Sequence, residues 1–402
     1  MKKTLILALS SLMYAGAAFA AAGYDVVGII WPAYHPAPRW KELGIFEHGN
    51  GEWQNIYEAK PKFEGHDQPK VPLWGYEDES DPIVIARRID AALAAGINVF
   101  MYDWYWYQNR PFLENALNNG FLKAPNNERM KFFLMWANHN VDYLWNNKKA
   151  VKKADPALFD ARVSMDEYKE VLVPRFISYF KKPNYYKIEG KPVMSLFVLR
   201  LFVKGVGGLK EAREAVEYLD SETKKAGFPG VHFMMVGSLP KEISKDIKVL
   251  PNGEPTSREA LAKYLHIDSD TCYNWCQYFN AKDQDYGEWC NENIANWSKV
   301  ADEIKIPYFP NVTTGWDNNP RYPEGTYTKI VKGSNPKDYE RALRAAKKWI
   351  DANVQKGMPK MIFINSWNEW TEGGYLEPDQ TFGYGFLNAT ARVFGGCGQQ
   401  SE

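Results

Sequence analysis

The sequence predicts a single (β/α)8-barrel domain of the TIM type, an α/β fold with long strand-to-helix loops. Apolar runs of strand length recur along the chain, and amphipathic stretches with helix start and stop signals lie between several of them. About eight strands that alternate with helices are typical of such a barrel. A doubly wound open sheet is the alternative, but no glycine-rich nucleotide turn follows the first run.

The predicted strands are continuous apolar runs rather than alternating ones, as parallel strands covered on both faces require. In chain order they are Asp25–Trp31, Ile97–Trp104, Lys131–Ala137, Pro192–Val198, Val231–Gly237, Ile306–Val312 and Met361–Trp367. A weaker candidate near Leu265–Cys272 completes the set.

Capping residues indicate helices between these strands. Ser80-Asp81-Pro82 offers an N-cap and a proline for the first turn of a helix over Ile83–Ala95, and Gly96 ends it. Two further helices are indicated in the same way, over Glu211–Ala226 and from Asn335 to about Val354.

Two connections are unusually long, roughly Pro32–Tyr76 and Asn252–Asn296. Loops of this length in compact domains are usually functional or ordered by their own contacts. The second holds Cys272, Cys276 and Cys290, with no histidine at ligand spacing beside them. We expect one local disulfide or none, with the pairing left open. No repeat or clear linker divides the chain, which favours one domain.

The first twenty residues have the order of a secretory signal peptide. Lys2 and Lys3 form a charged start, Thr4–Tyr14 is a short apolar run, and Ala18-Phe19-Ala20 supplies small residues for cleavage. We therefore expect a signal peptide over residues 1–20, a catalytic domain over residues 21–402, and a secreted or periplasmic protein. The apolar run is too short to span a bilayer, and no membrane insertion is expected of the mature chain.

The composition argues against nucleic acid as a partner, because 49 basic and 49 acidic residues leave no basic excess. The aromatic fraction is high, at 15% of the chain with 15 tryptophans. Indole and phenol rings suit both a protein core and stacking against sugars. No H-E-x-x-H, G-x-S-x-G or EF-hand pattern is present, so a metalloprotease, an esterase and an EF-hand calcium site lose their usual support. We assign no cofactor and no metal ligand, and a divalent ion at the barrel rim is left open.

The active site of a (β/α)8 barrel lies at the C-terminal ends of the strands. The richest segment there is Trp367–Gly373, with Glu369 and Glu372 among indoles and amides. Cleavage of a glycoside needs a proton donor and a second carboxyl group, and these two glutamates can divide those tasks. Trp367 and Trp370 can provide the drier setting that raises the pKa of one of them.

Further substrate-binding candidates follow other strands or lie in the first long loop. They are Glu52, Trp53, Asp103, Tyr105, Trp106, Trp136, Asn138, Trp316, Asp317, Arg321, Trp367, Asn368, Trp370 and Glu377. Several have structural alternatives: Asp103 as a rim carboxylate, Asp317 with Arg321 as a loop-holding ion pair, and Glu52 with Trp53 as loop packing. Asn138 is preferred to His139, because a lone histidine is more often structural.

The segment Phe363–Gly373, continued by Leu376–Asp379 and Tyr384, resembles the C-terminal signature of the WbsX-type proteins, which are related to glycoside hydrolase family 99. The likeness covers nearly the whole mature chain. It extends to Gly315–Asn318, Trp136–Asn138, Tyr102–Trp106, Phe63–His66 and Glu52-Trp53.

This resemblance implies a barrel that acts on glycans. Family 99 enzymes are retaining endo-α-mannosidases whose catalytic pair lies in an Asn-Glu-Trp-x-Glu-Gly segment, which Asn368–Gly373 matches. Glu369 would act as a base on the sugar 2-hydroxyl, and Glu372 would protonate the leaving group and then activate water. Sugar-nucleotide donors are cytoplasmic, so an exported enzyme would lack them. The expected export therefore favours hydrolysis of a glycan or polysaccharide over glycosyl transfer. A glycosyltransferase of surface-polysaccharide synthesis and a non-catalytic glycan-binding barrel are the alternatives.

Overall fold

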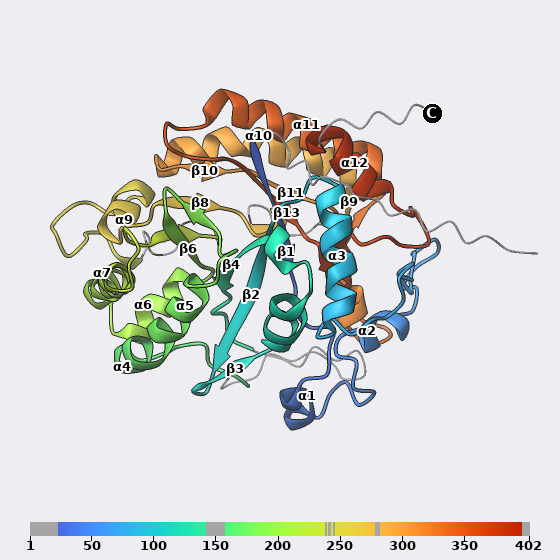
Figure 1. The fold of residues 1–402 in the computed structure, drawn as a ribbon. Helices are drawn as coiled ribbons and strands as arrows, with labels where there is room; N and C mark the ends of the chain where they lie inside the picture. The colour runs from blue at the N-terminus through green and yellow to red at the C-terminus, as the bar shows by residue number, and fades with distance from the viewer. Residues whose placement is uncertain are drawn as a thin grey trace, which may run out of the picture.

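The strands expected from the sequence assemble into one parallel barrel in the computed structural model (Figure 1). The structure describes residues 23–141, 157–237, 239, 243, 246–277 and 282–395. The strand order is β10-β8-β7-β6-β4-β2-β1-β13-β11, with every neighbouring pair parallel. The barrel strands are β1 (Tyr24–Ile30), β2 (Val99–Tyr107), β4 (Lys131–Trp136), β6 (Lys191–Leu196), β7 (His232–Met235), β8 (Ser269–Thr271), β10 (Tyr308–Phe309), β11 (Asn311–Thr313) and β13 (Lys360–Asn365).

β10 and β11 are two halves of one strand interrupted at Pro310. β10 pairs with β8, whereas β11 pairs with β13. Proline has no N–H to donate to a neighbouring strand, but the Pro310 carbonyl still accepts a bond of 3.0 Å from the Phe363 amide. The two halves together link the ends of the sheet, so the predicted (β/α)8 barrel is confirmed with the segment 308–313 as its seventh strand.

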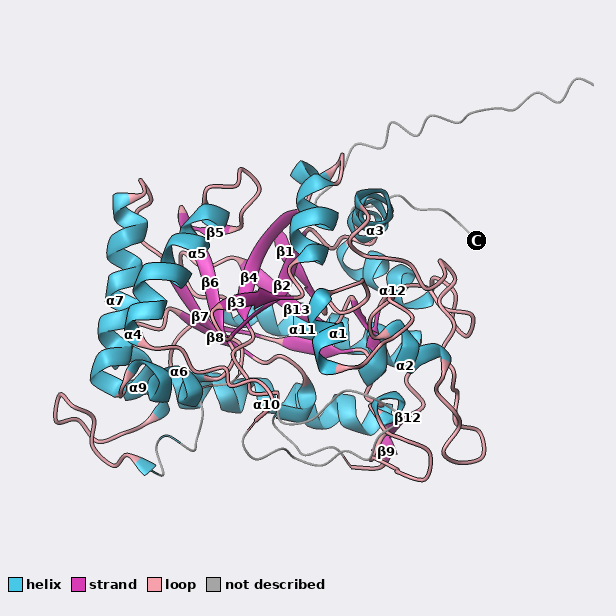
Figure 2. Cartoon of the chain, turned by 90° about the horizontal axis from the view of Figure 1, so that it is seen from below, coloured by secondary structure: helices cyan, strands magenta, loops and turns pink. Residues whose placement is uncertain are grey.

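Helices cover the outside of the barrel (Figures 1 and 2). The three expected helices are α3 (Pro82–Ala94), α7 (Leu209–Lys225) and α11 (Pro336–Asn353). The Asp81 side chain caps α3 by accepting from the Ile83 amide. The other α-helices are α1 (Pro38–Leu43), α2 (Trp53–Tyr57), α4 (Met165–Glu167), α5 (Val173–Phe180), α6 (Leu199–Val206), α9 (Arg258–Tyr264), α10 (Tyr286–Ile304) and α12 (Gly385–Phe394).

Short elements decorate the strand-to-helix loops. They are the strands β3 (Arg110–Phe112), β5 (Lys187–Ile188), β9 (Gln284–Asp285), β12 (Val331–Lys332), β14 (Asn368–Glu369) and β15 (Gly374–Tyr375), and the 3-10 or π turns η1 (Ala116–Gly120), η2 (Phe121–Lys123), η3 (Asn127–Arg129), η4 (Tyr168–Leu172), η5 (Trp275–Gln277), η6 (Asn319–Arg321) and η7 (Trp370–Glu372).

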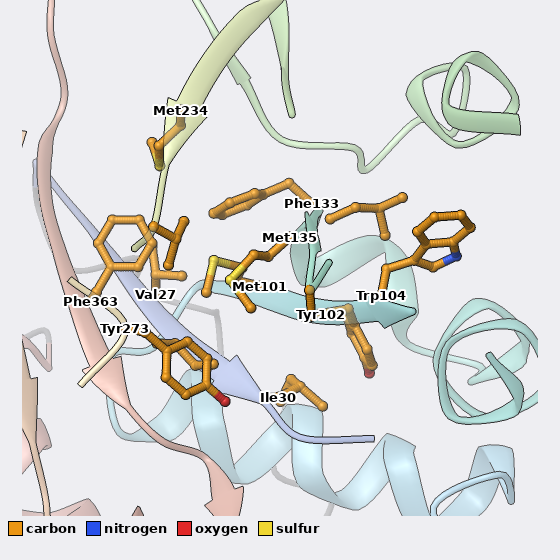
Figure 3. Close-up of a cluster of buried hydrophobic side chains, with 14 of the residues drawn as sticks. Val27, Ile30, Met101, Tyr102, Trp104, Phe133, Met135, Met234, Tyr273 and Phe363 are labelled. Atoms are coloured by element: carbon orange, nitrogen blue, oxygen red, sulfur yellow. The ribbon is translucent and has the colours of Figure 1, made fainter. Parts of the chain in front are cut away.

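The barrel interior is filled by one face of every strand. Register partners on neighbouring strands face the same side of the sheet. Phe363 is paired with Val27, and Met101 with Phe133, and these side chains gather in the centre of the barrel together with Met234 (Figure 3). All five are fully buried, so the interior is a packed core that closes the barrel below its C-terminal rim.

The long loop after β1 has a hydrophobic core of its own. Trp53 is fully buried in it and packs against Tyr34, Tyr76 and Trp370, and its indole donates to the Glu77 carbonyl at 2.8 Å. Of the two roles considered for Trp53, the structure gives it the packing one.

The expected signal peptide, residues 1–20, lies outside the described residues. No disulfide joins Cys272, Cys276 and Cys290 to one another, which is one of the two outcomes expected from the sequence. No helix in the described part of the chain is long and apolar enough to cross a membrane.

Candidate active site

A pocket of about 200 Å³ opens at the C-terminal rim of the barrel. Its charged and hydroxyl-bearing lining residues include Asp103, Tyr273, Arg321, Glu369 and Glu372. Its apolar and aromatic lining residues include Trp31, Tyr105, Met135, Ala137 and Phe197. These residues follow or end different strands, which is where a barrel of this kind places its chemistry.

A tight hairpin after β13 presents both glutamates to the pocket. β14 and β15 pair antiparallel, with Glu369 opposite Gly374, and η7 forms the turn between them. Ser366 fixes the base of the hairpin, because its hydroxyl accepts from the Glu369 amide at 3.1 Å and donates to the Gly374 carbonyl at 2.5 Å. Gly373 has φ +67°, a conformation that favours glycine over other residues.

Glu377 holds this hairpin from behind. Its carboxylate accepts from the indoles of Trp367 at 3.1 Å and Trp370 at 2.8 Å, and it pairs with Arg88 at 2.8 Å. The side chain of Asn368 bonds both the amide and the carbonyl of Trp31, each at 2.9 Å. We expected Trp367, Asn368, Trp370 and Glu377 to bind substrate, but all four are buried behind the pocket, where they position the glutamates.

One guanidinium group serves three carboxylates. Arg321 lies 2.7 Å from Glu52, 2.5 Å from Glu372 and 3.6 Å from Glu369. Glu52 is completely buried and also accepts from the Trp31 indole at 2.6 Å and from the Thr371 hydroxyl at 2.8 Å. Arg321 therefore lies in the pocket as expected, and Glu52 anchors it from outside the pocket lining.

Tyr273 bridges two further acids. Its hydroxyl lies 2.8 Å from Asp103 Oδ2 and 3.0 Å from Glu369 Oε2. Tyr273 was absent from the sequence-based candidates because it follows β8, the strand with the weakest signal. Asp103, a candidate rim carboxylate, lies within the pocket lining.

The described lining of the pocket holds three buried or partly buried acids but one arginine, and the pKa values of all three acids are raised. Burial raises the pKa of Glu369 well above its usual value, and the neighbouring Glu372 raises it further, while Arg321 lowers it. Burial also raises the pKa of Glu372, against Arg321. Burial raises the pKa of Asp103 well above its usual value, and the Tyr273 hydrogen bond opposes this. The site therefore retains protons that exposed carboxylates would lose.

Successive residues of a strand point to opposite faces, so only some of the substrate-binding candidates on β2 face the pocket. Asp103 and Tyr105 face the pocket. Trp106 faces outward, stacks on Trp104 with ring centroids 5.7 Å apart, and donates to Glu167 at 2.7 Å. It is only 3% exposed. We expected Trp106 to bind substrate, but its indole face is covered by protein.

The same alternation places the two candidates at the end of β4, Trp136 and Asn138, away from the pocket. Trp136 is buried against Tyr168, Phe176 and Phe202 on the outer face. The Asn138 amide is used by the backbone of Val198, at 2.9 and 2.7 Å. Both were expected in the pocket, and neither lines it. His139, which we had set aside, lies in the pocket lining.

Trp316 and Asp317 line a different cavity of about 370 Å³, on the other side of the Glu372-Gly373 turn. The Asp317 carboxylate accepts from His66 and Gln68, each at 2.8 Å. Its amide donates to the Glu372 carbonyl at 2.7 Å. Asp317 thus supports the turn instead of facing the two glutamates, and it does not pair with Arg321 as we had considered. No cluster of three or more acidic, histidine or cysteine side chains suited to a metal ion occurs among the described residues.

A family model described as "Glycosyltransferase WbsX" matches residues 26–390. The chain is 24% identical over 380 residues to the "Uncharacterized protein WxcX" of Xanthomonas campestris pv. campestris, and 25% identical to the protein of that description from strain B100. Each alignment covers 92% of this chain and 49% of the relative, so the chain spans about half the length of these relatives.

Solved structures share the barrel over almost its full length. A "Glycoside hydrolase-like protein" superposes with a TM-score of 0.57 at 14% identity, covering 93% of this chain and 95% of that one. The "GH99 endo-alpha-mannosidase from Bacteroides thetaiotaomicron" gives 0.56 at 16% identity, covering 92% and 96%. At these identities the likeness establishes the fold.

Proposed function

The chain belongs to the WbsX glycosyltransferase family, and on that premise we propose that it is a glycan-acting enzyme that hydrolyses O-glycosidic bonds with Glu369 and Glu372. The observation that supports hydrolysis best is the pair itself. Two buried or nearly buried carboxyl groups on one short turn face one pocket beside Arg321. Glycoside cleavage requires such a pair, one carboxyl group as the proton donor and a second one as the base.

In the proposed reaction, Glu369 accepts the proton of the sugar 2-hydroxyl, whose oxygen attacks the anomeric carbon. Glu372 gives a proton to the departing glycosidic oxygen as the bond to the anomeric carbon breaks. Water then attacks that carbon, Glu372 takes its proton, and the 2-oxygen recovers a proton from Glu369. Anomeric configuration is retained overall, because the anomeric carbon is inverted twice.

The surroundings of the two acids support this division. The side chain of Glu372 is 16% exposed and that of Glu369 is 4% exposed, so Glu372 is the one with access to a leaving group and to water. Burial raises the pKa of Glu372, which is the direction that a general acid needs. Phe197 is an aromatic residue of the pocket lining that is only partly buried, and an exposed ring face of this kind suits the apolar face of a sugar.

We further propose that the enzyme is exported and acts on a polysaccharide or glycan with an α-mannoside-like linkage. Export rests on the charged start and apolar run of residues 1–20. The α-mannoside-like linkage rests on the barrel shared with the endo-alpha-mannosidase and on the Asn-Glu-Trp-x-Glu-Gly segment.

The test is a glycan screen. Purified residues 21–402 and the Glu369→Gln/Glu372→Gln double variant are incubated with plant, yeast and mucosal polysaccharides, and the products are read by mass spectrometry. We expect oligosaccharide release by the wild type alone. Release by both proteins would remove the two glutamates from the mechanism, and release by neither, with the fold intact, would argue against hydrolysis.

A glycosyltransferase is the second candidate, favoured by the description of the family to which the chain belongs. The two activities separate cleanly in one assay. A transferase forms a longer glycan only when a sugar-nucleotide donor is added, whereas a hydrolase releases sugar without any donor.

A further inference from the structure

The hydroxyl of Tyr273 has one proton but faces two carboxyl oxygens. Asp103 Oδ2 lies at 2.8 Å and Glu369 Oε2 at 3.0 Å. A phenol donates one hydrogen bond and accepts others through its oxygen. It can therefore donate to one of these acids only, and the second contact is a hydrogen bond only if that acid carries a proton and donates to the phenol oxygen.

The charges around the two acids decide which of them carries the proton. Burial raises the pKa of Glu369 as it does that of Asp103, but Glu369 has Arg321 Nη2 at 3.6 Å, which opposes the rise and favours its ionised form. Asp103 has no ion pair among the described residues, and its Oδ1 is buried without a hydrogen-bond partner there. An ionised carboxylate in that position would be costly.

The other groups that face Asp103 strengthen this assignment. Glu369, Glu372, Tyr105, His139 and Arg321 line the same pocket as Asp103. Burial raises the pKa of Asp103 well above its usual value, and Arg321, the cation of this pocket, pairs with Glu369 and Glu372 instead. Burial raises the pKa of Tyr273 well above its usual value, so the phenol keeps its proton.

We propose that Asp103 is a protonated positioning residue that donates to the Tyr273 oxygen, so that the Tyr273 proton points to Glu369 and holds its carboxylate ready to accept a proton. This rests on the proposed function for the use made of Glu369. No proton leaves the Asp103-Tyr273 pair during catalysis. The proton that Glu369 takes from a sugar hydroxyl is returned by Glu369.

Infrared difference spectroscopy tests the proton directly. The wild-type-minus-Asp103→Asn difference spectrum near neutral pH should contain the carbonyl stretch of one protonated carboxyl group, since the other protonated acids contribute equally to both proteins. Glu369→Gln should keep the band, because its amide oxygen still accepts from Tyr273. Loss of the band in Glu369→Gln, with its survival in Asp103→Asn, would overturn the proposal.

The pH dependence of kcat/KM gives a second readout, since its acidic limb reports the base of the free enzyme. Asp103→Asn keeps an N–H that donates to Tyr273, so this limb should stay near its wild-type position. Asp103→Leu likewise removes no charge if Asp103 is protonated, and Tyr273 can still donate to Glu369, so the limb should again stay near its wild-type position. Tyr273→Phe removes the donor and should move the limb upward by roughly one to two pH units, because a hydrogen bond to ionised Glu369 is lost.

The two failures are distinguishable. If no glycan is cleaved, the infrared band still decides whether Asp103 is protonated, and only the proposed function falls. If glycans are cleaved but Asp103→Asn and Asp103→Leu both move the limb downward, a negative charge beside Glu369 has been removed, so the proton assignment falls and hydrolysis stands.

Discussion

Arg321 Nε lies 2.7 Å from Glu52 Oε1, so a residue of the loop after the seventh strand neutralises a buried carboxylate in the loop after the first. The same guanidinium reaches both candidate catalytic glutamates. Its removal should therefore affect folding and activity together.

We expect Arg321→Met to lower the free energy of unfolding by about 3–5 kcal/mol, because Glu52 is left as an unpaired buried charge. Urea denaturation measures this. The Glu52→Gln/Arg321→Met double variant, which buries no charge at this pair, should recover part of the loss. A double variant less stable than Arg321→Met would contradict the inference that Glu52 is a buried charge neutralised by Arg321.

Glu377→Ala should destabilise the fold by roughly 3 kcal/mol, since it leaves Arg88 buried with one partner fewer and two indole N–H groups without their acceptor. Glycan cleavage should fall as well, because the hairpin that presents Glu369 and Glu372 loses its support. Thermal unfolding and initial rates check the two effects. Glu214→Ala, a variant of an exposed ion pair with Lys210, is the matched control and should change neither appreciably.

Trp106→Ala should cost about 3–5 kcal/mol of stability as a large-to-small core substitution. KM should change little in the protein that remains folded, because this indole is covered by Trp104 and by the contact with Glu167. A large rise in KM with unchanged stability would return Trp106 to the substrate-binding surface.

Glu372→Ala should cut the cleavage of natural glycans by about 100-fold or more, the contribution expected of general acid catalysis. Activated aryl glycosides should suffer less, since a good leaving group needs little protonation. Steady-state rates on both substrates make the comparison. Equal losses would argue against Glu372 as the acid.

Asp270 should make stability depend on pH. Burial raises its pKa from 3.8 to about 7 in the folded chain, so between these values the native state binds more proton than the unfolded state. The stability present at low pH is then lost as pH rises through that window. Urea denaturation of wild type and Asp270→Asn at about pH 4, 5.5 and 7.5 should show the variant gaining relative to wild type as pH rises. A constant difference would contradict this.

The fold was predictable because all the barrel strands except β8 are distinct apolar runs, and the glutamate pair directly follows the last of them. The sequence did not predict which residues of each strand face the barrel interior. Both faces of a parallel barrel strand are apolar, so the run Tyr102–Trp106 does not indicate which of its residues point inward. Asp103 and Tyr105 prove to be inside, whereas Trp104 and Trp106 lie outside.

Long-range pairings were equally hidden. Glu52 and Arg321 are separated by 269 positions, and no spacing rule connects them. Tyr273 follows a strand of three residues, too short to stand out in a sequence. The residues that support the hairpin, Trp367, Trp370 and Glu377, have the same chemical types as sugar-binding residues, and only their burial reveals the difference.

One edge of the first strand, β1, stays unpaired during synthesis until the last barrel strand has been made. One edge of β1 is paired with β2, which follows soon after it, but the other edge is paired only with β13. The backbone of Trp31 at its end is held by Asn368. Until those last residues emerge from the ribosome, an apolar strand edge stays unpaired and can join another chain. Chains truncated before β13 should therefore aggregate or depend on chaperones, however complete their remaining strands are.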